Sequence, residues 1–238
     1  MKLALIGYGK MGKTIERMAI AQGHEVLLKI DVNNYADLNT DNLRKVDAAI
    51  EFTRPESAFD NVLKCLKAGI PVVSGTTGWG DKKEEIDELC RQYKGAFFYA
   101  SNYSVGVNIF FALNSFLAKM MDTQVQYEVE MEEIHHTEKL DAPSGTAITL
   151  AEGIFENLPR KKDWVNEAST QKELLPIISK RVPKVKGTHQ INYKSAIDDL
   201  EIKHVAHSRE GFAGGAIQAA AWLIGKEGVY GMKDMLGF

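Results

Sequence analysis

Residues 2–12 of the chain read KLALIGYGKMG, and this stretch decides the fold of the N-terminal part of the protein. Its first five residues form a short apolar run that predicts a buried strand. A helical pattern follows the glycines and places Ile15 and Ala19 on one face. The order is therefore strand, GxGxxG, helix, which is the context in which these glycines bind a dinucleotide.

The GxGxxG motif predicts a Rossmann-like α/β domain with a parallel sheet. Gly7 and Gly9 allow a tight turn and a close approach of the backbone to a pyrophosphate at the helix N-terminus. A second strand, Glu25–Ile30, ends at Asp31, nineteen positions after Gly12. An acidic residue at about this distance accepts hydrogen bonds from the adenosine ribose.

The same loop also matches a second motif. Gly7, four further residues and then Gly12, Lys13 and Thr14 fit the P-loop pattern GxxxxGK[ST]. In that motif Lys13 would bind phosphates and Thr14 a magnesium ion. Asp31 and the compact Gly-Tyr-Gly turn favour the dinucleotide interpretation, and a P-loop NTPase stays open as an alternative.

Composition sets broad limits on function. The 238 residues carry a net charge of −3 and are 45% hydrophobic and 26% charged, as in ordinary globular proteins. Nucleic-acid binders are usually basic, so we expect no nucleic-acid partner. The longest apolar stretch, Val107–Met121, contains polar residues, and the N-terminus enters a strand without a signal-peptide pattern, so we expect no membrane partner. Cys65 and Cys90 each fall on an apolar helical face, which predicts buried thiols and a cytoplasmic protein.

Strands and helices alternate through the first hundred residues, which predicts ligands at the carboxyl ends of parallel strands. The further strands are Val46–Phe52, Ile70–Val73 and Ala96–Ala100, and the further helices are Glu56–Ala68 and Asp81–Tyr93. Loops rich in Gly, Thr, Ser or Asn lie at the strand ends, at Gly7–Gly12, Phe52–Arg54, Gly75–Thr77 and Ser101–Ser104. A cofactor would contact these loops.

The pattern changes near residue 104 and predicts an inserted α+β domain with a mostly antiparallel sheet. Its expected helices are Val107–Met121 and Thr146–Asn157, its expected strands are Gln124–Glu132, Leu175–Val182, Thr188–Ser195 and Glu201–His207, and Arg160–Gln171 is expected to be a loop. A last, alanine-rich helix is expected at Gly215–Gly225.

The stretch Glu133–Ala147, EIHHTEKLDAPSGTA, concentrates groups that can hold an anion and move a proton. His135 and His136 titrate near neutral pH, and Lys139 supplies a cation. Ser144–Thr146 adds hydroxyls and backbone N–H groups at the start of a helix. The alternative is that the His and Lys residues belong to an ordinary solvated loop. Such a loop would not need an anion-binding turn directly after its charged residues. A metal site is not expected, because adjacent histidines on an extended segment diverge and no third ligand has suitable spacing.

Taken together, the motifs resemble those of the 4-hydroxy-tetrahydrodipicolinate (dihydrodipicolinate) reductase family of lysine and diaminopimelate biosynthesis. The matching segments are GYGKMG (7–12), EFTRPES (51–57), GTTGW (75–79), ASNYSVGVN (100–108), EIHHTEKLDAPSGTA (133–147) and HSREGFAGGA (207–216). The central block is the most specific of them. The chain departs from the family pattern at Arg181–His189, where Pro183 and Lys184 stand in place of a Gly and an Asp.

The resemblance implies an enzyme that reduces a small cyclic dicarboxylate, 4-hydroxy-tetrahydrodipicolinate, to tetrahydrodipicolinate with NADH or NADPH. It implies that His135 is the acid/base residue and that Lys139 is a proton donor. His136, Ser144, Gly145 and Thr146 are expected to bind the substrate. The expected cofactor-binding residues are Ile6, Gly7, Tyr8, Gly9, Lys10, Met11, Gly12, Asp31, Phe52, Thr53, Gly75, Thr76, Thr77, Ala100, Ser101, Asn102 and Tyr103.

The resemblance also implies a domain organisation. Residues 1–103 with 209–238 would form the dinucleotide-binding domain, and residues 104–208 the substrate-binding and oligomerisation domain of a homotetramer. The chain would pass between the two domains near Ser104 and near Ser208–Arg209, and these two crossings would act as hinges that close the domains around the substrate. Asp31 should favour NADH, and we expect NADH to be used at least as well as NADPH. A non-catalytic dinucleotide sensor is the other alternative, against which the dense His-Lys loop argues.

Overall fold

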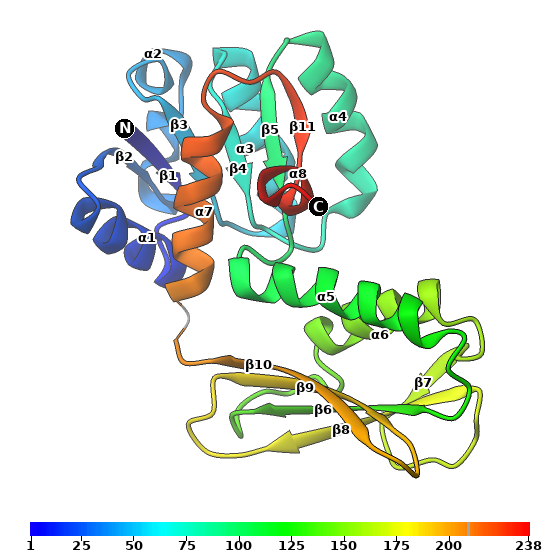
Figure 1. The fold of residues 1–238 in the computed structure, drawn as a ribbon. Helices are drawn as coiled ribbons and strands as arrows, with labels where there is room; N and C mark the ends of the chain where they lie inside the picture. The colour runs from blue at the N-terminus through cyan, green and yellow to red at the C-terminus, as the bar shows by residue number, and fades with distance from the viewer. Residues whose placement is uncertain (209) are drawn as a thin grey trace. The chain divides into compact units, whose positions relative to one another are not determined.

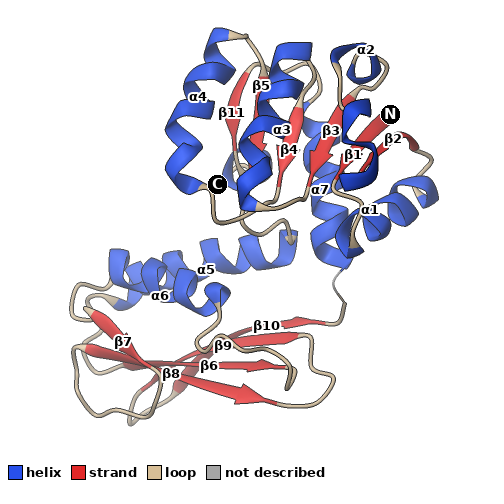
Figure 2. Ribbon diagram, turned by 180° about the vertical axis from the view of Figure 1, so that it is seen from behind, coloured by secondary structure: helices blue, strands red, loops and turns tan. Residues whose placement is uncertain are grey.

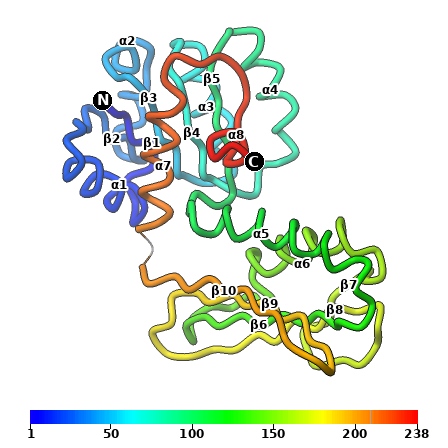
Figure 3. The backbone as a smooth tube through the Cα atoms, viewed as in Figure 1, coloured from blue at the N-terminus to red at the C-terminus, as the bar shows by residue number. Residues whose placement is uncertain are grey.

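The computed structural model describes residues 1–208 and 210–238. The chain forms two compact units, Met1–Val105 with Glu210–Phe238, and Gly106–Arg209. Figure 3 follows the chain out of the first unit after residue 105 and back into it for the C-terminal segment. Of the expected crossing at Ser208–Arg209, Arg209 lies outside the described residues.

A parallel six-stranded sheet forms the centre of the first unit, as the sequence predicts. Its strands are β1 (Lys2–Ile6), β2 (Glu25–Ile30), β3 (Ala48–Glu51), β4 (Val72–Ser74), β5 (Ala96–Tyr99) and β11 (Gly228–Tyr230), in the order β11-β5-β4-β3-β1-β2. Strand β11 was not predicted from the sequence. Because successive side chains of a strand point to opposite faces, Leu3 and Leu5 join one core and Ala4 and Ile6 the other.

Helices cover both faces of this sheet, as apolar strands without alternation require. One face packs against α1 (Lys10–Ala21), α7 (Glu210–Leu223) and α8 (Met232–Leu236), which lie toward the viewer in Figure 1. The other packs against α2 (Thr40–Leu43), α3 (Pro55–Ala68) and α4 (Lys83–Gln92), and Figure 2 shows α3 and α4 from that side. Two 3-10 turns, η1 (Val32–Asp37) and η2 (Gly80–Lys82), lie between these elements.

Small residues let α7 pack closely, as its alanine-rich sequence predicts. A Cβ added at Gly215 would lie only 1.8 Å from the carbonyl oxygen of Tyr103, so only glycine fits there. The helix begins earlier than expected, at Glu210. Cys65 and Cys90 are buried and unpaired with each other, as predicted, and burial raises the pKa of both thiols.

The second unit is an α+β unit whose helices pack against a five-stranded sheet. Its elements are α5 (Val105–Met121), β6 (Glu128–His135), α6 (Gly145–Asn157), β7 (Asp163–Val165), β8 (Leu174–Arg181), β9 (Gly187–Lys194) and β10 (Asp199–Ala206), with strand order β10-β9-β6-β8-β7. Phe110 and Leu117 of α5 and Leu150 of α6 share a core with inward residues of β6, β8 and β9. None of the described helices is both long and apolar enough to cross a membrane.

Three expectations for this unit are wrong. The sheet is mixed, because β6 and β7 each pair with β8 in parallel. The expected loop Arg160–Gln171 contains β7, a strand too short to show a periodic pattern. Strand β6 begins at Glu128, four residues later than expected, because Tyr127 N–H bonds Gln124 in a turn and leaves Val125 76% exposed.

Candidate active site

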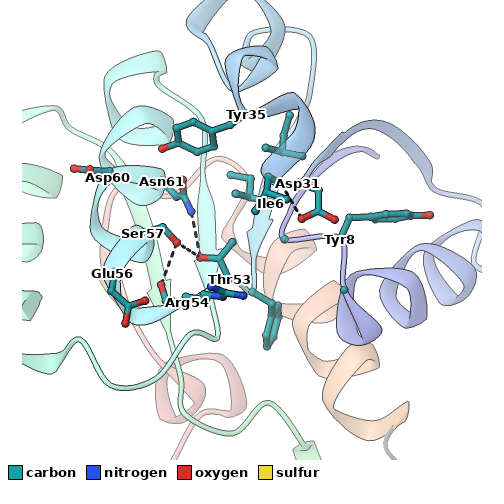
Figure 4. Close-up of a pocket in the computed structure, with 15 residues that line it drawn as sticks. Ile6, Tyr8, Asp31, Tyr35, Thr53, Arg54, Glu56, Ser57, Asp60 and Asn61 are labelled. Carbon is teal, nitrogen blue, oxygen red and sulfur yellow. Dashed lines mark hydrogen bonds between the residues drawn. The ribbon is translucent and has the colours of Figure 1, made fainter.

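A pocket of about 840 Å³ opens at the carboxyl ends of β1, β2 and β3 in the first unit. The strand order reverses between β1 and β3, and ligands of open α/β sheets bind at such a point. Of the expected cofactor residues, Ile6, Gly7, Tyr8, Gly9, Asp31, Phe52 and Thr53 line it. Figure 4 shows Asp31 and Tyr8 on one side and Ser57, Asp60 and Asn61 of α3 on the other.

The glycines of the first loop have distinct structural roles. Gly7 has φ +95°, and a Cβ there would lie 1.9 Å from the carbonyl oxygen of Phe52. A Cβ at Gly12 would lie 2.3 Å from the carbonyl oxygen of Gly7. At Gly9, by contrast, no described atom lies within 4 Å of the Cβ position. Gly7 and Gly12 therefore shape the turn, and Gly9 leaves the backbone open on the pocket side.

The start of α1 argues against the P-loop alternative. The helix begins at Lys10, so Lys13 and Thr14 already lie inside it. Lys13 N–H donates to the carbonyl oxygen of Gly9 at 3.1 Å, and the Thr14 hydroxyl donates to Lys10 at 2.9 Å. These groups make helical hydrogen bonds, whereas a P-loop would present them to a triphosphate and its magnesium ion.

Asp31 follows β2 and caps η1 at the pocket edge. Its Oδ1 accepts from Val32 N–H at 2.8 Å, and its side chain is exposed. Lys29, which could offset this charge, donates to Glu16 at 3.0 Å. Arg54, in a loop expected to contact the cofactor, lines the same pocket and adds a cation to which the sequence assigned no role. Tyr35, Ser57 and Asn61 also line it and were missed, because the residues of η1 and α3 carry no motif of their own.

A buried carboxylate connects the loops that follow β3 and β4. Glu51, the last residue of β3, is 0% exposed. It accepts hydrogen bonds from the backbone N–H of Thr53 at 2.9 Å, from the Thr53 hydroxyl, and from Ser74 and Thr76 at 2.5 and 2.8 Å. Thr53 N–H also donates to the Thr76 hydroxyl at 2.7 Å. This network was not predicted, because nothing in the local sequence distinguishes Glu51 from a surface glutamate.

The remaining expected cofactor residues do not line this pocket. They are Lys10, Met11, Gly12, Gly75, Thr76, Thr77, Ala100, Ser101, Asn102 and Tyr103. Thr76 and Tyr103 are buried, and the Tyr103 hydroxyl donates to the carbonyl oxygen of Ser74 at 2.7 Å. Thr77 and Ser101 are exposed at the ends of β4 and β5. Their roles toward the nicotinamide stay predictions.

In the second unit, strand register gathers the polar groups of the His-Lys region. Glu133 and His135 lie on the inward face of β6, after the apolar Val129 and Met131. Glu133 pairs with Ser179 of β8 on one side and His189 of β9 on the other, and His135 pairs with Arg181. The apolar core thus ends in two polar rows. His189 was missed, because only strand pairing brings it here.

Glu133 is the centre of these rows and is 0% exposed. Its carboxylate accepts from Ser144 N–H at 3.1 Å and from the Ser179 hydroxyl at 2.8 Å, and Arg181 approaches Oε1 at 3.4 Å. Burial acts to raise the pKa of Glu133, but hydrogen bonds involving His189, Ser144 and Ser179 outweigh it and hold the pKa at about 2. Glu133 is therefore ionised at neutral pH.

His135 is neutral at neutral pH, because burial dominates its pKa. Burial lowers its pKa to about 4, although the Glu133 charge acts in the opposite direction. Its ring meets that of His189 edge to face, with centroids 5.1 Å apart. A neutral, buried imidazole can accept a proton or pass one on.

Lys139 lies in the loop after β6, close to Arg181. Its ammonium pairs with Asp141 at 2.7 Å, and this contact lowers the pKa of Asp141. The Arg181 guanidinium donates to the carbonyl oxygens of Lys139 at 3.2 Å and Asp141 at 2.5 Å. Arg181 therefore holds the loop of Lys139 and Asp141 against the end of β8 through these hydrogen bonds. At the altered turn beyond it, Lys184 adopts φ +67° where the family pattern has Asp.

The expected substrate residues lie at the start of α6 and beside it. The Ser144 hydroxyl caps the helix, accepting from Ala147 N–H at 3.2 Å. Gly145 is exposed, with no described atom within 4 Å of its Cβ position, and Thr146 is half-buried. His136 is half-buried, and its carbonyl oxygen accepts from Lys139 N–H at 3.2 Å. Such a helix N-terminus favours an anion.

Glu133, His135 and His189 have the composition of a metal site. One potential ligand atom from each lies within 4.8 Å of the others. Arg181 already approaches the carboxylate, however, and Ser144 and Ser179 hydrogen-bond it. A cation would meet the Arg181 charge and displace these bonds, so we assign the cluster to hydrogen bonding.

Two family models match the chain. The model for the N-terminus of dihydrodipicolinate reductase covers residues 1–103, and the model for its C-terminus covers residues 106–236. The chain belongs to the dihydrodipicolinate reductase family. Membership makes the chain an NAD(P)H-dependent oxidoreductase of lysine and diaminopimelate biosynthesis, which confirms the predicted family, activity and cofactor class.

Individual relatives agree with this assignment. A 4-hydroxy-tetrahydrodipicolinate reductase of Christiangramia forsetii is 48% identical, over 99% of this chain and 98% of the relative. One of Acinetobacter baumannii is 32% identical, over 99% and 96%. The solved structure of a dipicolinate-bound dihydrodipicolinate reductase from Paenisporosarcina sp. TG-14 is 25% identical and superposes with a TM-score of 0.82, covering 98% of both chains.

Proposed function

We propose that this reductase acts on 4-hydroxy-tetrahydrodipicolinate with His135 as the acid/base residue and Lys139 as a proton donor. When bound, the reduced nicotinamide supplies the hydride, so the protein must orient the ring and supply the proton. The observation that carries the proposal is the presence of a buried neutral imidazole, an ammonium and a helix N-terminus within residues 135–146. A positioned acid or base contributes ~10²–10⁴ in rate.

The substrate carboxylates would bind at the start of α6 and at Lys139. Backbone N–H groups of Gly145 and Thr146 and the Ser144 turn suit one carboxylate. Lys139 suits the other, because its ammonium already binds a carboxylate, that of Asp141, at 2.7 Å. We infer that substrate competes with Asp141 for Lys139. His136, at the beginning of the same loop, would complete the substrate site.

The cofactor would bind in the first unit. Its pyrophosphate suits the open backbone at Gly9, and its adenosine ribose suits Asp31 at the edge of the 840 Å³ pocket. The loops at Gly75–Thr77 and Ala100–Tyr103 would frame the nicotinamide. Both units must then contribute to one reaction, with the crossings near Ser104 and Ser208 as hinges.

We further propose a homotetramer in the cytoplasm. The proposal rests on the family and on the sheet of the second unit, because α5 and α6 cover one face and no described element of that unit covers the other in Figures 1 and 2. A light-scattering mass four times that of the 26.5 kDa chain is expected. A monomeric mass would contradict the tetramer.

Binding of pyridine-2,6-dicarboxylate, a planar analogue of the substrate, tests the site. We expect the analogue to inhibit competitively against the substrate. Calorimetry should show that Lys139→Ala binds the analogue at least about tenfold more weakly than the wild type, because one charge-assisted contact contributes ~1.5–3 kcal/mol. Lys162→Ala is the matched control, because Lys162 pairs with Glu173 at 3.3 Å on the surface of the same unit. Equal affinity of the two variants for the analogue would contradict the assignment of Lys139.

A further inference from the structure

Glu133 is a fully buried carboxylate that the proposed function leaves without a role. Ser144 N–H donates to both of its oxygens at 3.1 Å, and their other neighbours differ. Oε1 accepts from Ser179 at 2.8 Å and approaches Arg181 at 3.4 Å, on the β8 side. Oε2 faces two imidazoles, with His135 Nδ1 at 3.4 Å and His189 Nε2 at 3.7 Å.

The two ring nitrogens of His135 have different surroundings. Nδ1 is buried and has no hydrogen-bond partner among the described residues, so the Glu133 carboxylate is the acceptor within reach. Nε2 lies beside Gly187, where an added Cβ would come within 3.3 Å of it. A side chain at position 187 would therefore crowd Nε2, and glycine avoids this contact.

We propose that Glu133 is a positioning residue for the reaction: its carboxylate holds the proton of His135 on Nδ1 and leaves Nε2 to exchange protons with substrate. The proposal rests on the proposed acid/base role of His135. A carboxylate that orients a histidine in this way fixes its tautomer and stabilises its protonated form. The 3.4 Å separation fits a contact that tightens in the substrate complex, as catalytic hydrogen bonds commonly do.

The charges around His135 make Glu133 the group that favours protonation of the ring. The ring faces Glu133 on its own strand, His189 on β9, Lys139 in the following loop and Arg181 on β8. Of these groups only Glu133 carries a negative charge. Burial, Lys139 and Arg181 all oppose protonation of the ring, and Glu133 favours it. Without Glu133, the imidazole would lose both its orientation and its basicity.

Glutamine at position 133 separates this role from a structural one. In the native protein Ser144 N–H donates to the Glu133 carboxylate at 3.1 Å. The carbonyl oxygen of glutamine can accept the same hydrogen bond, so the turn before α6 is retained. The amide has no charge to favour the Nδ1–H tautomer. Glu133→Gln should therefore lower kcat and leave the KM for substrate nearly unchanged.

The first test uses the unaltered enzyme, so it does not depend on how any variant folds. Histidine labelled with ¹⁵N reports the protonated ring nitrogen, and the His135 signals are identified by their loss in His135→Gln. The proposal predicts that His135 carries its proton on Nδ1 at pH 7. A proton on Nε2 would overturn it.

The second test compares Glu133→Gln with Glu132→Gln, the same change one residue earlier on the opposite face of β6, where Glu132 pairs with Lys180. We expect kcat to fall by about tenfold or more in Glu133→Gln, with KM within about twofold, and His135 to populate both tautomers. Glu132→Gln should behave as the wild type. Unchanged turnover in Glu133→Gln, or slow turnover with the Nδ1–H tautomer intact, would overturn the proposal.

These outcomes are distinct from failure of the proposed function. If His135→Gln turns over at the wild-type rate, the acid/base role of His135 fails, and with it this proposal. If His135→Gln is inactive but the native ring carries its proton on Nε2, only the role of Glu133 fails.

Discussion

The Thr76 hydroxyl donates a 2.8 Å hydrogen bond to the fully buried carboxylate of Glu51. Because Glu51 ends β3 and Thr76 follows β4, this contact fixes two neighbouring loops relative to each other. Thr53, which lines the pocket, donates to both partners. The loops expected to hold the two halves of the cofactor are thus connected through one buried charge.

Glu51→Gln should therefore weaken cofactor binding. The amide offers one acceptor in place of two oxygens, and its NH₂ group meets hydroxyls that already donate. We expect the KM for NADH to rise by roughly tenfold and the free energy of unfolding to fall by about 1–3 kcal/mol. Steady-state kinetics and thermal melts measure both. Glu25→Gln, on an exposed site at the amino end of β2, is the control, and equal behaviour of the two variants would contradict the role of Glu51.

Alanine at Gly7 and at Gly9 of the first loop should act in different ways. Gly7→Ala places a Cβ 1.9 Å from a backbone oxygen at φ +95°, so the backbone must move and the melting temperature should fall. Gly9→Ala meets no described atom within 4 Å, so its melting temperature should stay near the wild type. Its methyl group would nevertheless block a pyrophosphate, and the KM for NADH should rise. Unchanged KM in Gly9→Ala would remove the pyrophosphate from this loop.

The Asp31 carboxylate should set the preference between NADH and NADPH. It would repel a 2′-phosphate, although Arg54 in the same pocket offers a compensating cation. We expect wild-type kcat/KM for NADH to equal or exceed that for NADPH, and Asp31→Ser to shift the ratio toward NADPH by about tenfold, ~1.4 kcal/mol. Asp37→Ser, in the same η1 turn, is the control. A tenfold NADPH preference of the wild type would place Asp31 away from the ribose.

The depressed pKa of His135 should make stability depend on pH. In the folded state this pKa is about 4, below the ordinary value of 6.5, so the unfolded chain binds more protons between these values and stability falls as pH drops from 6.5 to 4. At pH 5 this loss amounts to ~2 kcal/mol relative to pH 7 at most. His135→Gln removes it, so its melting temperature should decline less on acidification. Parallel declines for the two proteins would contradict a buried neutral imidazole.

Local sequence was sufficient to predict β1 to β5 and the helices α1, α3 and α4 of the first unit. Apolar runs and glycines specify β1, its turn and α1 through contacts between near neighbours, and the loops at the strand ends follow from the parallel arrangement. Positions such as Gly7 are predictable because their backbone conformation excludes other residues. By contrast, β7 and β11 were missed because three residues carry no periodic signal.

The buried polar groups could not be predicted from local patterns. Glu133 resembles the outward-facing glutamates of β6 until the register places it between Ser179 and His189. Glu51 becomes a shared acceptor only when β3 and β4 pair. Such roles depend on which residues meet across strands, and a single sequence does not specify that register.

Turnover of His135→Gln and Lys139→Ala measures whether these two side chains transfer protons in the reaction. Oxidation of NADH is followed by absorbance, with 4-hydroxy-tetrahydrodipicolinate as substrate. We expect rapid oxidation by the wild type and a loss of about 10²-fold or more in kcat for each variant, because each removes a positioned proton-transfer group. Near-wild-type rates in both variants would contradict it.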